Sequence, residues 1–275
     1  MVGDATLVDT HCHLNLREFD ADREIVIARA RLAGVARIMV PGIDVATSRA
    51  AVGLARDEEG VFAAVGIHPH HAGDLDPAAL AELQELAASP KVVAVGEIGL
   101  DYFRHLAPAE VQRAAFEQQL ELAATLELPV IVHNRDAFAD VLACLMHWTS
   151  ALGERLAGRR GVLHAFSGDA QGALAGGGCG FYFGVAGPVT YPNAEERRRV
   201  TAALPSDRVL VETDSPYLTP QPHRGQRNEP AFARLVAEKL GEITGQSLSQ
   251  VALTTSANAA HLFGWDDGTD NRNVL

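Results

Sequence analysis

The sequence predicts a single α/β domain folded as a TIM-type (β/α)₈ barrel. Its 275 residues suit one such barrel, which typically has ~250. Short β-branched runs alternate with longer amphipathic stretches, the pattern of parallel βαβ units. Residues that can bind metal stand at the ends of most predicted strands. A closed barrel would bring those ends together at one mouth, whereas an open sheet would spread them along an edge.

Eight short apolar runs are predicted to be the barrel strands. Several of them, such as residues 92–95, are apolar without alternation, as expected for strands buried on both faces. The predicted strands are Leu7–Thr10, Ile38–Val40, Val61–Gly66, Val92–Gly96, Val130–Val132, Gly161–Leu163, Phe181–Val185 and Val209–Glu212.

Helix starts are marked by capping residues. Asp76 followed by Pro77 predicts one helix start, and Asn193 is predicted to cap a helix with acidic residues in its first turn. The glycine-rich stretch Ala170–Gly180 is expected to be a loose connection. Further helices are predicted over Glu110–Leu126, Pro230–Leu240 and Ser247–Phe263. The barrel domain is predicted to span residues 1–264, followed by a polar tail over residues 265–275.

Composition and charge restrict the classes of function. The chain has 47% hydrophobic and 21% charged residues, and no apolar run approaches the ~18 residues of a membrane span. The N-terminus lacks the pattern of a signal peptide. Cys12, Cys144 and Cys179 form no CxxC pair, which favours reduced thiols and a cytoplasmic protein.

The net charge of −12 bears on the partners of the protein. An acidic protein repels the phosphate backbone of nucleic acid, so we expect no extended nucleic-acid-binding surface. The absence of a long apolar run likewise predicts no membrane partner. A phosphate-bearing substrate, such as a DNA end or a small phosphodiester, must then be bound at a local site.

The metal-type residues are histidines and carboxylates at the ends of predicted strands. His11 and His13 are two apart on extended backbone, so both imidazoles face one way and Cys12 packs on the other side. The candidate ligands are His11, His13, Glu97, His133, His164 and Asp214.

Each candidate alone has an ordinary structural interpretation. His133 suits a core histidine, and Asp214 before Ser215 and Pro216 suits the cap of a turn. If each residue had only such an ordinary role, all six would lie at the same end of five strands by chance. Burying two carboxylates side by side without a cation is also costly. The set therefore favours a metal site.

Six ligands are too many for one metal with an open position, so we expect two divalent ions, which Glu97 would bridge. Such ions lower the pKa of a bound water, and the resulting hydroxide attacks the substrate. Asp214 is expected to orient that water and to accept its proton, so Glu97 and Asp214 are the candidate catalytic residues. Magnesium, manganese and zinc all remain open. The expected division gives one ion His11, His13 and Asp214, and the other His133 and His164.

The sequence resembles the TatD-type metal-dependent deoxyribonucleases, a branch of the amidohydrolase-like barrels. The resemblance implies a TIM-type barrel, two divalent metals and hydrolysis of phosphodiester bonds, chiefly from DNA ends in the 3′ to 5′ direction. The ligand positions of the family coincide with the six candidates. The segments that carry the resemblance are VDTHCHL (Val8–Leu14), VGIHPH (Val65–His70), GEIGLDYFR (Gly96–Arg104), LPVIVHNRDA (Leu128–Ala137), HAFSG (His164–Gly168) and ETDSPYLTPQPHRGQRNEP (Glu212–Pro230).

Further polar residues follow the strand ends and are candidates for substrate binding. They would supply the local positive surface that the acidic chain otherwise lacks. A solvated rim is the alternative interpretation for the arginines, and residues 197–199 are interpreted as an ordinary helix face. The candidates are His68, Arg104, Arg135, Arg224 and Asn228, with His105 and Arg227 beside them.

Two other functions stay open. The same metal site could serve an amidohydrolase or esterase that cleaves a C–N or carboxyl ester bond, for example in aminoacyl-tRNA. A metal-stabilised scaffold without activity is disfavoured, since a structural site needs fewer ligands.

Overall fold

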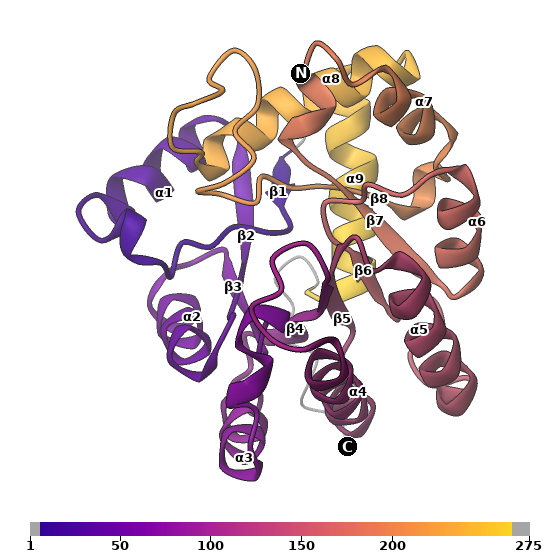
Figure 1. The fold of residues 1–275 in the computed structure, drawn as a ribbon. Helices are drawn as coiled ribbons and strands as arrows, with labels where there is room; N and C mark the ends of the chain where they lie inside the picture. Colours follow the sequence, from indigo (N-terminus) through magenta and orange to yellow (C-terminus); the bar gives the residue numbers. More distant parts are fainter. Residues whose placement is uncertain (1–5, 266–275) are drawn as a thin grey trace.

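The computed structural model describes residues 6–265, in which eight parallel strands form one sheet in the order β1 to β8. Figure 1 shows the strands around a common centre, with helices outside them. The predicted TIM-type barrel is confirmed. The strands are β1 (Leu7–Asp9), β2 (Val35–Pro41), β3 (Val61–Val65), β4 (Val92–Asp101), β5 (Val130–Arg135), β6 (Gly161–Leu163), β7 (Phe181–Val185) and β8 (Val209–Val211).

Helices connect successive strands, and 3₁₀ turns occupy several loops. The α-helices are α1 (Arg23–Leu32), α2 (Val45–Asp57), α3 (Pro77–Leu86), α4 (Ala109–Leu126), α5 (Phe138–Leu152), α6 (Ala170–Gly178), α7 (Glu195–Ala203), α8 (Ala233–Thr244) and α9 (Leu248–Phe263). The 3₁₀ turns are η1 (Arg17–Phe19), η2 (Pro69–Asp74), η3 (Gly187–Thr190), η4 (Ser206–Arg208) and η5 (Pro230–Phe232).

Three strands extend further than the sequence predicts: β2, which covers Val35–Pro41 instead of Ile38–Val40, and the two ligand-bearing strands β4 and β5. β4 continues through Glu97 to Asp101, and β5 continues through His133 to Arg135. The backbones of these two segments pair in parallel, with Gly99 opposite His133. Pairing thus carries both strands beyond their apolar runs, and their metal-type side chains stand on rigid strand instead of loop.

The helix starts confirm some of the capping predictions and correct one. The Asp76 carboxylate accepts a hydrogen bond from the Ala79 amide at 2.8 Å, as its place before Pro77 predicts. Asn193 was expected to cap the helix that follows it, α7. This helix begins at Glu195, however, and Ala194 occupies the N-cap position without a side-chain hydrogen bond. The expected helix from Pro230 is a 3₁₀ turn, η5, followed by α8.

The glycine-rich stretch corrects a second prediction, since it forms α6 instead of a loose connection. Asp169 caps this helix by accepting from the Gly172 amide at 2.8 Å. A Cβ atom on Gly176 would lie 2.8 Å from Leu163 of β6. The glycines therefore let α6 pack close against the barrel, which compensates for their poor helix propensity.

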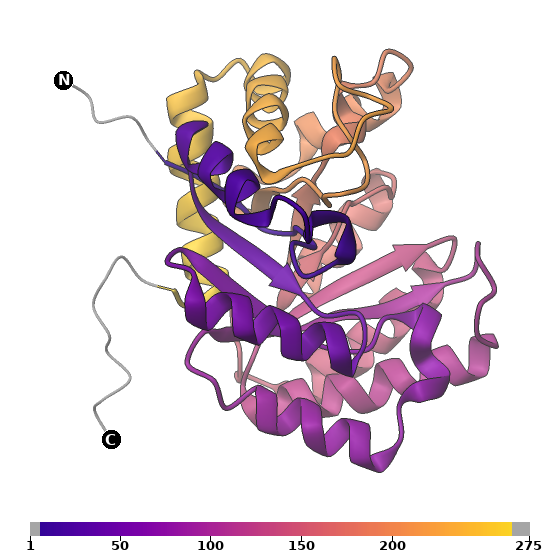
Figure 2. The same cartoon turned by 90° about the vertical axis from the view of Figure 1, so that its left-hand side faces the viewer.

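The inside of the barrel is filled by side chains from every strand. These side chains form one cluster with residues of α9 and Trp265, which close the barrel at the N-terminal ends of the strands. Figure 2 shows α9 across this end, opposite the arrowheads. The cluster contains Val8, Met39, Ala64, Val93, Ile131, Val162, Tyr182 and Leu210, with Leu262, Phe263 and Trp265 below them. Trp265 is only 3% exposed, so it belongs to the core and not to the predicted polar tail. The rest of that tail, 266–275, lies outside the described residues.

Backbone hydrogen bonds join β1 and β8 beyond the ends of the strands. The Thr10 amide donates to the Val211 carbonyl at 3.1 Å, and the Asp214 amide donates to the His11 carbonyl at 2.8 Å. The His13 amide donates to the Ser215 carbonyl at 2.7 Å. We call this contact the seam, because it closes the barrel with the same segments that carry three candidate ligands.

A buried aspartate side chain, whose pKa is raised by burial to about 8, holds the seam together. Asp9 is fully buried, and its side chain accepts hydrogen bonds from the amides of His11 and Thr213 and from the Thr213 hydroxyl, the last at 2.6 Å. Cys12 is also fully buried and packs in the core, as predicted. Within residues 6–265, no helix combines the length and the apolar character needed to cross a membrane.

Replacing Trp265 with alanine tests its place in the core. The ring packs on Phe62 and Phe263, with centroids 4.6 and 4.7 Å away, so its removal leaves a cavity below the barrel. We expect Trp265→Ala to lower the free energy of unfolding in urea by about 3 kcal/mol. The control Leu253→Ala, at a side chain 68% exposed on α9, should change it by less than about 0.5 kcal/mol. Equal effects would contradict this description of the core.

Candidate metal centre

His11 and His13 leave β1 on extended backbone and face the same side of the chain. Their Nε2 atoms lie 3.1 Å apart, and both residues are buried. The geometry that their spacing predicts is thus present. Two imidazole nitrogens this close, aimed at one point, form the kind of pair that can bind a single cation.

Glu97 stands between two sets of histidines. Its Oε2 lies 3.3 Å from His11 Nε2 and 3.5 Å from His13 Nε2. Its Oε1 lies 2.9 Å from His133 Nδ1 and 3.7 Å from His68 Nε2. Each carboxylate oxygen therefore faces a different pair of imidazoles.

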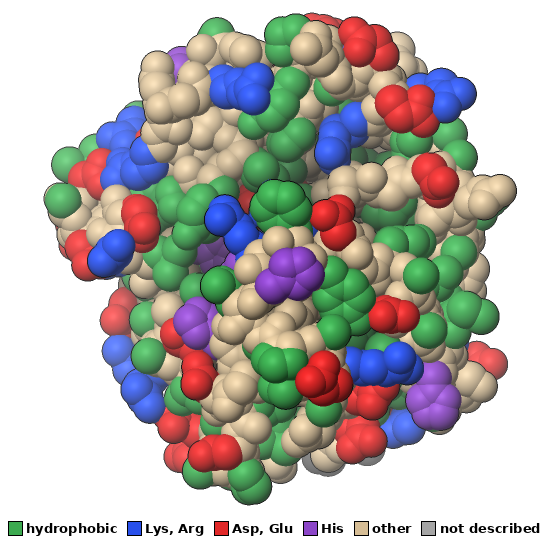
Figure 3. Space-filling model, in the orientation of Figure 1, with side chains coloured by type: hydrophobic (Ala, Val, Ile, Leu, Met, Phe, Trp, Pro, Cys, Tyr) green, Lys and Arg blue, Asp and Glu red, His purple; other side chains and the backbone are tan. Residues whose placement is uncertain are grey.

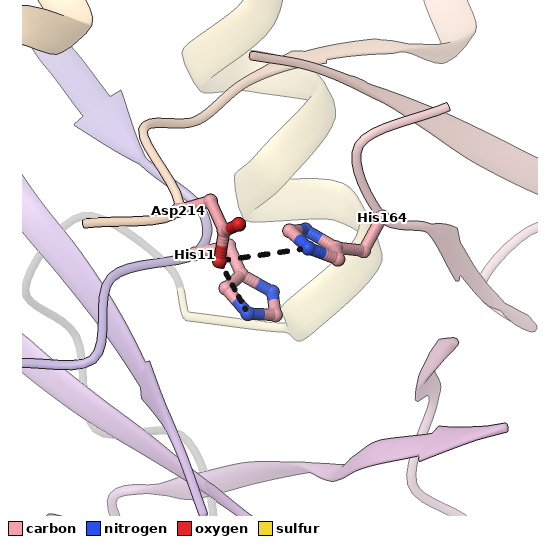
Figure 4. Close-up of side chains that lie close together, drawn as sticks. All are labelled: His11, His164 and Asp214. Carbon is pink, nitrogen blue, oxygen red and sulfur yellow. Dashed lines mark ion pairs between the residues drawn. The ribbon is translucent and has the colours of Figure 1, made fainter. Parts of the chain in front are cut away.

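Asp214 follows β8 and reaches the same cluster from the other side of the seam (Figure 4). Its Oδ1 lies 3.5 Å from His13 Nε2 and 3.7 Å from the Nε2 atoms of both His11 and His164. The backbone at Asp214 has φ of 58°, a left-handed conformation that aspartate tolerates better than most residues. The six predicted ligands thus come together in one site.

The ligand atoms form three overlapping groups, each with all its atoms within 4.8 Å of one another. The groups are His11, His164 and Asp214; His11, His13 and Glu97; and His68, Glu97 and His133. This grouping differs from the predicted division. His164 lies with His11, their rings stacked with centroids 3.6 Å apart, and not with His133. His68, which was predicted to bind substrate, lies in a group with Glu97 and His133.

Three polar side chains that the sequence analysis did not single out support the cluster. Glu212 is fully buried, and its Oε1 lies 3.0 Å from His164 Nδ1. Asp101 Oδ2 lies 3.2 Å from His133 Nε2 and 2.9 Å from His70 Nε2. Carboxylates behind ligating histidines fix the ring orientation and leave the other nitrogen free for a metal.

The sequence contained a signal for one of these residues. Glu97, Gly99 and Asp101 are spaced by two, so they share one face of a strand that continues past Gly96. A predicted strand that stopped at Gly96 could not use that spacing. Glu212 was placed at the end of β8, but nothing in its local pattern indicates that His164 is its partner.

Buried charge shifts the pKa values of the histidines in opposite directions. Burial lowers the pKa of His13, but hydrogen bonds to Asp214 and Glu97 outweigh it and raise that pKa to about 9. Burial likewise lowers the pKa of His164, but the charges of Glu212 and Asp214 raise it to about 10. Burial and the nearby His164 lower the pKa of His11. Protons on His13 and His164 therefore offset part of the negative charge of the carboxylates when no metal is bound.

The donor set fits a divalent metal. The Nδ1 atoms of His11 and His13 are buried and have no hydrogen-bond partner within residues 6–265, while their Nε2 atoms converge near Glu97. Mixed imidazole and carboxylate ligands suit zinc, manganese and other first-row ions, whereas magnesium prefers oxygen alone.

The candidates for substrate binding have different surroundings. Arg104 and Arg135 are exposed near the mouth, and the Arg135 guanidinium lies 3.8 Å from the centroid of the Phe103 ring. Asn228 is fully buried and donates to the carbonyls of Thr213 and Tyr217, so it braces the loop after β8.

The remaining residues of this set lie on the rim of the mouth. Arg227 is paired with Asp22, and Arg224 lies over the Tyr191 ring. His105 is exposed, with φ of 50°. On the face in Figure 3, basic and acidic side chains are interspersed around the histidines near its middle.

A family model described as TatD related DNase matches residues 8–264. The chain belongs to the TatD family. It is 41% identical to YabD of Bacillus subtilis, named an uncharacterized metal-dependent hydrolase, and covers 98% of that protein with 94% of its own length. It is 38% identical to a protein of Cronobacter sakazakii named 3′-5′ ssDNA/RNA exonuclease TatD, over 94% of this chain and 97% of that protein.

A solved structure agrees with this assignment. The crystal structure of YJJV, a TatD homolog from Escherichia coli, superimposes with a TM-score of 0.88 at 34% sequence identity. The match covers 95% of this chain and 99% of the other. The protein is therefore a TatD-family metal-dependent hydrolase.

Metal binding to this TatD-family protein should release protons. His13 and His164, with pKa values of about 9 and about 10, hold protons at pH 7, and an imidazole must be neutral to bind metal. We expect titration with Zn²⁺ to release about two protons and its affinity to fall as pH drops from 8 to 6. Calorimetry in buffers of different ionisation enthalpy measures the count. A heat independent of the buffer would contradict these protonation states.

Replacing Glu212 tests its support of His164. We expect Glu212→Gln to weaken metal binding about tenfold or more, because the amide no longer stabilises the imidazole orientation as a carboxylate does. The control is Glu196→Gln, an exposed side chain on α7 that pairs with Arg199. Equilibrium dialysis with Zn²⁺ gives both affinities, and similar values would remove Glu212 from the site.

Proposed function

We propose that the protein hydrolyses phosphodiester bonds of DNA and removes nucleotides from 3′ ends, using two divalent ions such as zinc, manganese or magnesium. The position of Glu97 is the observation that carries this proposal. Its two oxygens face separate histidine groups, which is the arrangement of a carboxylate that bridges two metals. The relative named as a 3′-5′ exonuclease supports the choice of bond and direction.

Divalent ions at such a site make a water nucleophilic near neutral pH and offset the charge that develops on a phosphoryl oxygen. Side chains of the protein hold the site together and accept the proton of the water. Glu97, with 3% of its surface exposed, lies too deep to meet a substrate and holds the site together. Asp214 has 13% of its side chain exposed, so one carboxylate can face both the cluster and an incoming water and accept its proton.

The proposed substrate needs local positive charge, since the chain as a whole carries −12. Arg104 and Arg135 are exposed on the loop after β4 and at the end of β5, and neither forms an ion pair with a carboxylate in the described part of the chain. Phe103 lies between them and is 52% exposed. A nucleic-acid strand could meet guanidinium groups and an aromatic ring here, both of which bind single strands without sequence preference.

Hydrolysis of a 5′-labelled single-stranded oligonucleotide tests the proposal. With manganese or magnesium added, the wild-type protein should shorten the strand stepwise from its 3′ end. Asp214→Ala should lower the rate by at least about a hundredfold, the usual minimum for a general base. The control Asp57→Ala, at an exposed residue on the last turn of α2, should retain the wild-type rate.

Other outcomes separate the alternatives. An Asp214→Ala protein that keeps full activity with an unchanged circular dichroism spectrum would remove Asp214 from the chemistry. The wild-type protein could instead bind metal, cleave no DNA and hydrolyse cyclic amides or aminoacyl esters. That result would favour the amidohydrolase or esterase alternative over the nuclease.

A further inference from the structure

A cavity of about 680 Å³ lies between the loop after β6, the end of β7 and the length of α7. Its size falls in the range of pockets that enclose a small ligand, roughly 300–1,000 Å³. The residues of interest in its lining are Phe166, Gly184, Tyr191, Glu196, Arg197 and Arg224.

The cavity and the metal centre share a wall. Phe166 comes two residues after His164, and its amide donates to the Gly184 carbonyl at 3.0 Å. A Cβ atom on Gly184 would lie 2.3 Å from Glu212 Oε2, and Glu212 itself contacts His164. Only glycine leaves room for that carboxylate. A ligand in the cavity would therefore lie one layer of side chains from the cluster.

Arg197 is a partly buried cation without a carboxylate partner. One of its five N–H groups donates to the Phe166 carbonyl at 2.9 Å, and it forms no ion pair among residues 6–265. Burial lowers the pKa of its guanidinium, which is the sign of a charge that its surroundings do not compensate. The interpretation of residues 197–199 as an ordinary helix face holds for Arg199, which pairs with Glu196, but not for Arg197.

Arg224 brings a second cation from the opposite wall, on the loop after β8 that also carries Asp214. Its Cζ lies 4.4 Å from the centroid of the Tyr191 ring, and it too has no carboxylate partner in the described chain. The Tyr191 hydroxyl donates to the Thr219 carbonyl at 3.2 Å, which fixes the ring. Glu196 is the one acidic residue in the described lining, and its carboxylate is engaged by Arg199 at 2.7 Å.

We propose that this cavity binds a nucleotide unit of the substrate next to the scissile bond. Arg197 and Arg224 contact a phosphate, and Tyr191 and Phe166 supply aromatic surface for the base. Guanidinium groups match the geometry of phosphate oxygens, and aromatic rings stack on any base. An uncompensated pair of cations in an otherwise acidic protein also favours an anionic ligand over a neutral one. The inference rests on the proposed function, because it names a subsite of the same reaction.

Binding of deoxyadenosine 5′-monophosphate to the metal-loaded full-length protein tests the cavity without catalysis. We expect calorimetry to show binding by the wild type, and Arg197→Gln and Arg224→Gln to weaken it about tenfold each. The control Arg113→Gln makes the same charge change on α4, at an exposed side chain that pairs with Glu117 away from the cavity, so its affinity should stay within about twofold of the wild type. Arg224 is exposed, which keeps the test valid if Arg197→Gln fails to fold. No binding by the wild type, or equal binding by all variants, would overturn the proposal.

Steady-state kinetics then separate this inference from the proposed function. With a short oligonucleotide, Arg224→Gln should raise KM about tenfold and change kcat little, while hydrolysis of bis(p-nitrophenyl) phosphate, which lacks a nucleotide, should match the wild type. Equal DNA cleavage by Arg224→Gln and the control Arg113→Gln would contradict the subsite without affecting the proposed nuclease activity. If the wild type binds the nucleotide through both arginines but cleaves no DNA, the proposed nuclease function is wrong and the cavity remains a nucleotide-binding site.

Discussion

The seam between β1 and β8 is the constraint on which the rest of the structure depends. The backbone bonds that close the barrel there involve His11, His13 and Asp214 themselves. Closing the barrel and bringing these ligands together are therefore the same event. The buried Asp9 side chain joins the two sides of the seam. It accepts a hydrogen bond from the His11 amide on one side and from the amide and hydroxyl of Thr213 on the other. A site built this way is as rigid as the sheet itself, which a metal centre requires if its ligands are to stay at fixed distances.

Charge explains why the cluster is stable without metal and suited to binding one. Protons offset part of the charge of the carboxylates buried among the imidazoles, since the pKa values of His13 and His164 are raised while those of Glu97 and Asp214 are lowered against the effect of burial. Cations can replace these protons without leaving an unpaired charge. Outside the cluster, four guanidinium groups near the mouth form no ion pair with a carboxylate among residues 6–265, namely those of Arg104, Arg135, Arg197 and Arg224. These cations supply local positive charge beside the site of an otherwise acidic chain.

Much of the fold and of the candidate site could be predicted from the sequence, because both follow from local patterns. Apolar runs separated by helix-length stretches indicate a parallel barrel, and polar residues at strand ends in such a barrel converge. The two-residue spacing of His11 and His13 predicts which side each faces. What could not be predicted depends on contacts between distant segments. Glu212, after β8, contacts His164, after β6, across the intervening strand β7, and His68 reaches Glu97 only because of the register between β3 and β4. Trp265 looks like the start of a polar tail until α9 places it under the barrel.

The most direct test of the central claim is a crystal structure of the zinc-loaded protein with anomalous scattering measured on both sides of the zinc edge. The claim is that strand-end ligands hold two ions with Glu97 between them. It predicts two anomalous peaks roughly 3.5–4 Å apart, one on each side of the Glu97 carboxylate. A single peak, or peaks that avoid Glu97, would contradict a binuclear centre at this site.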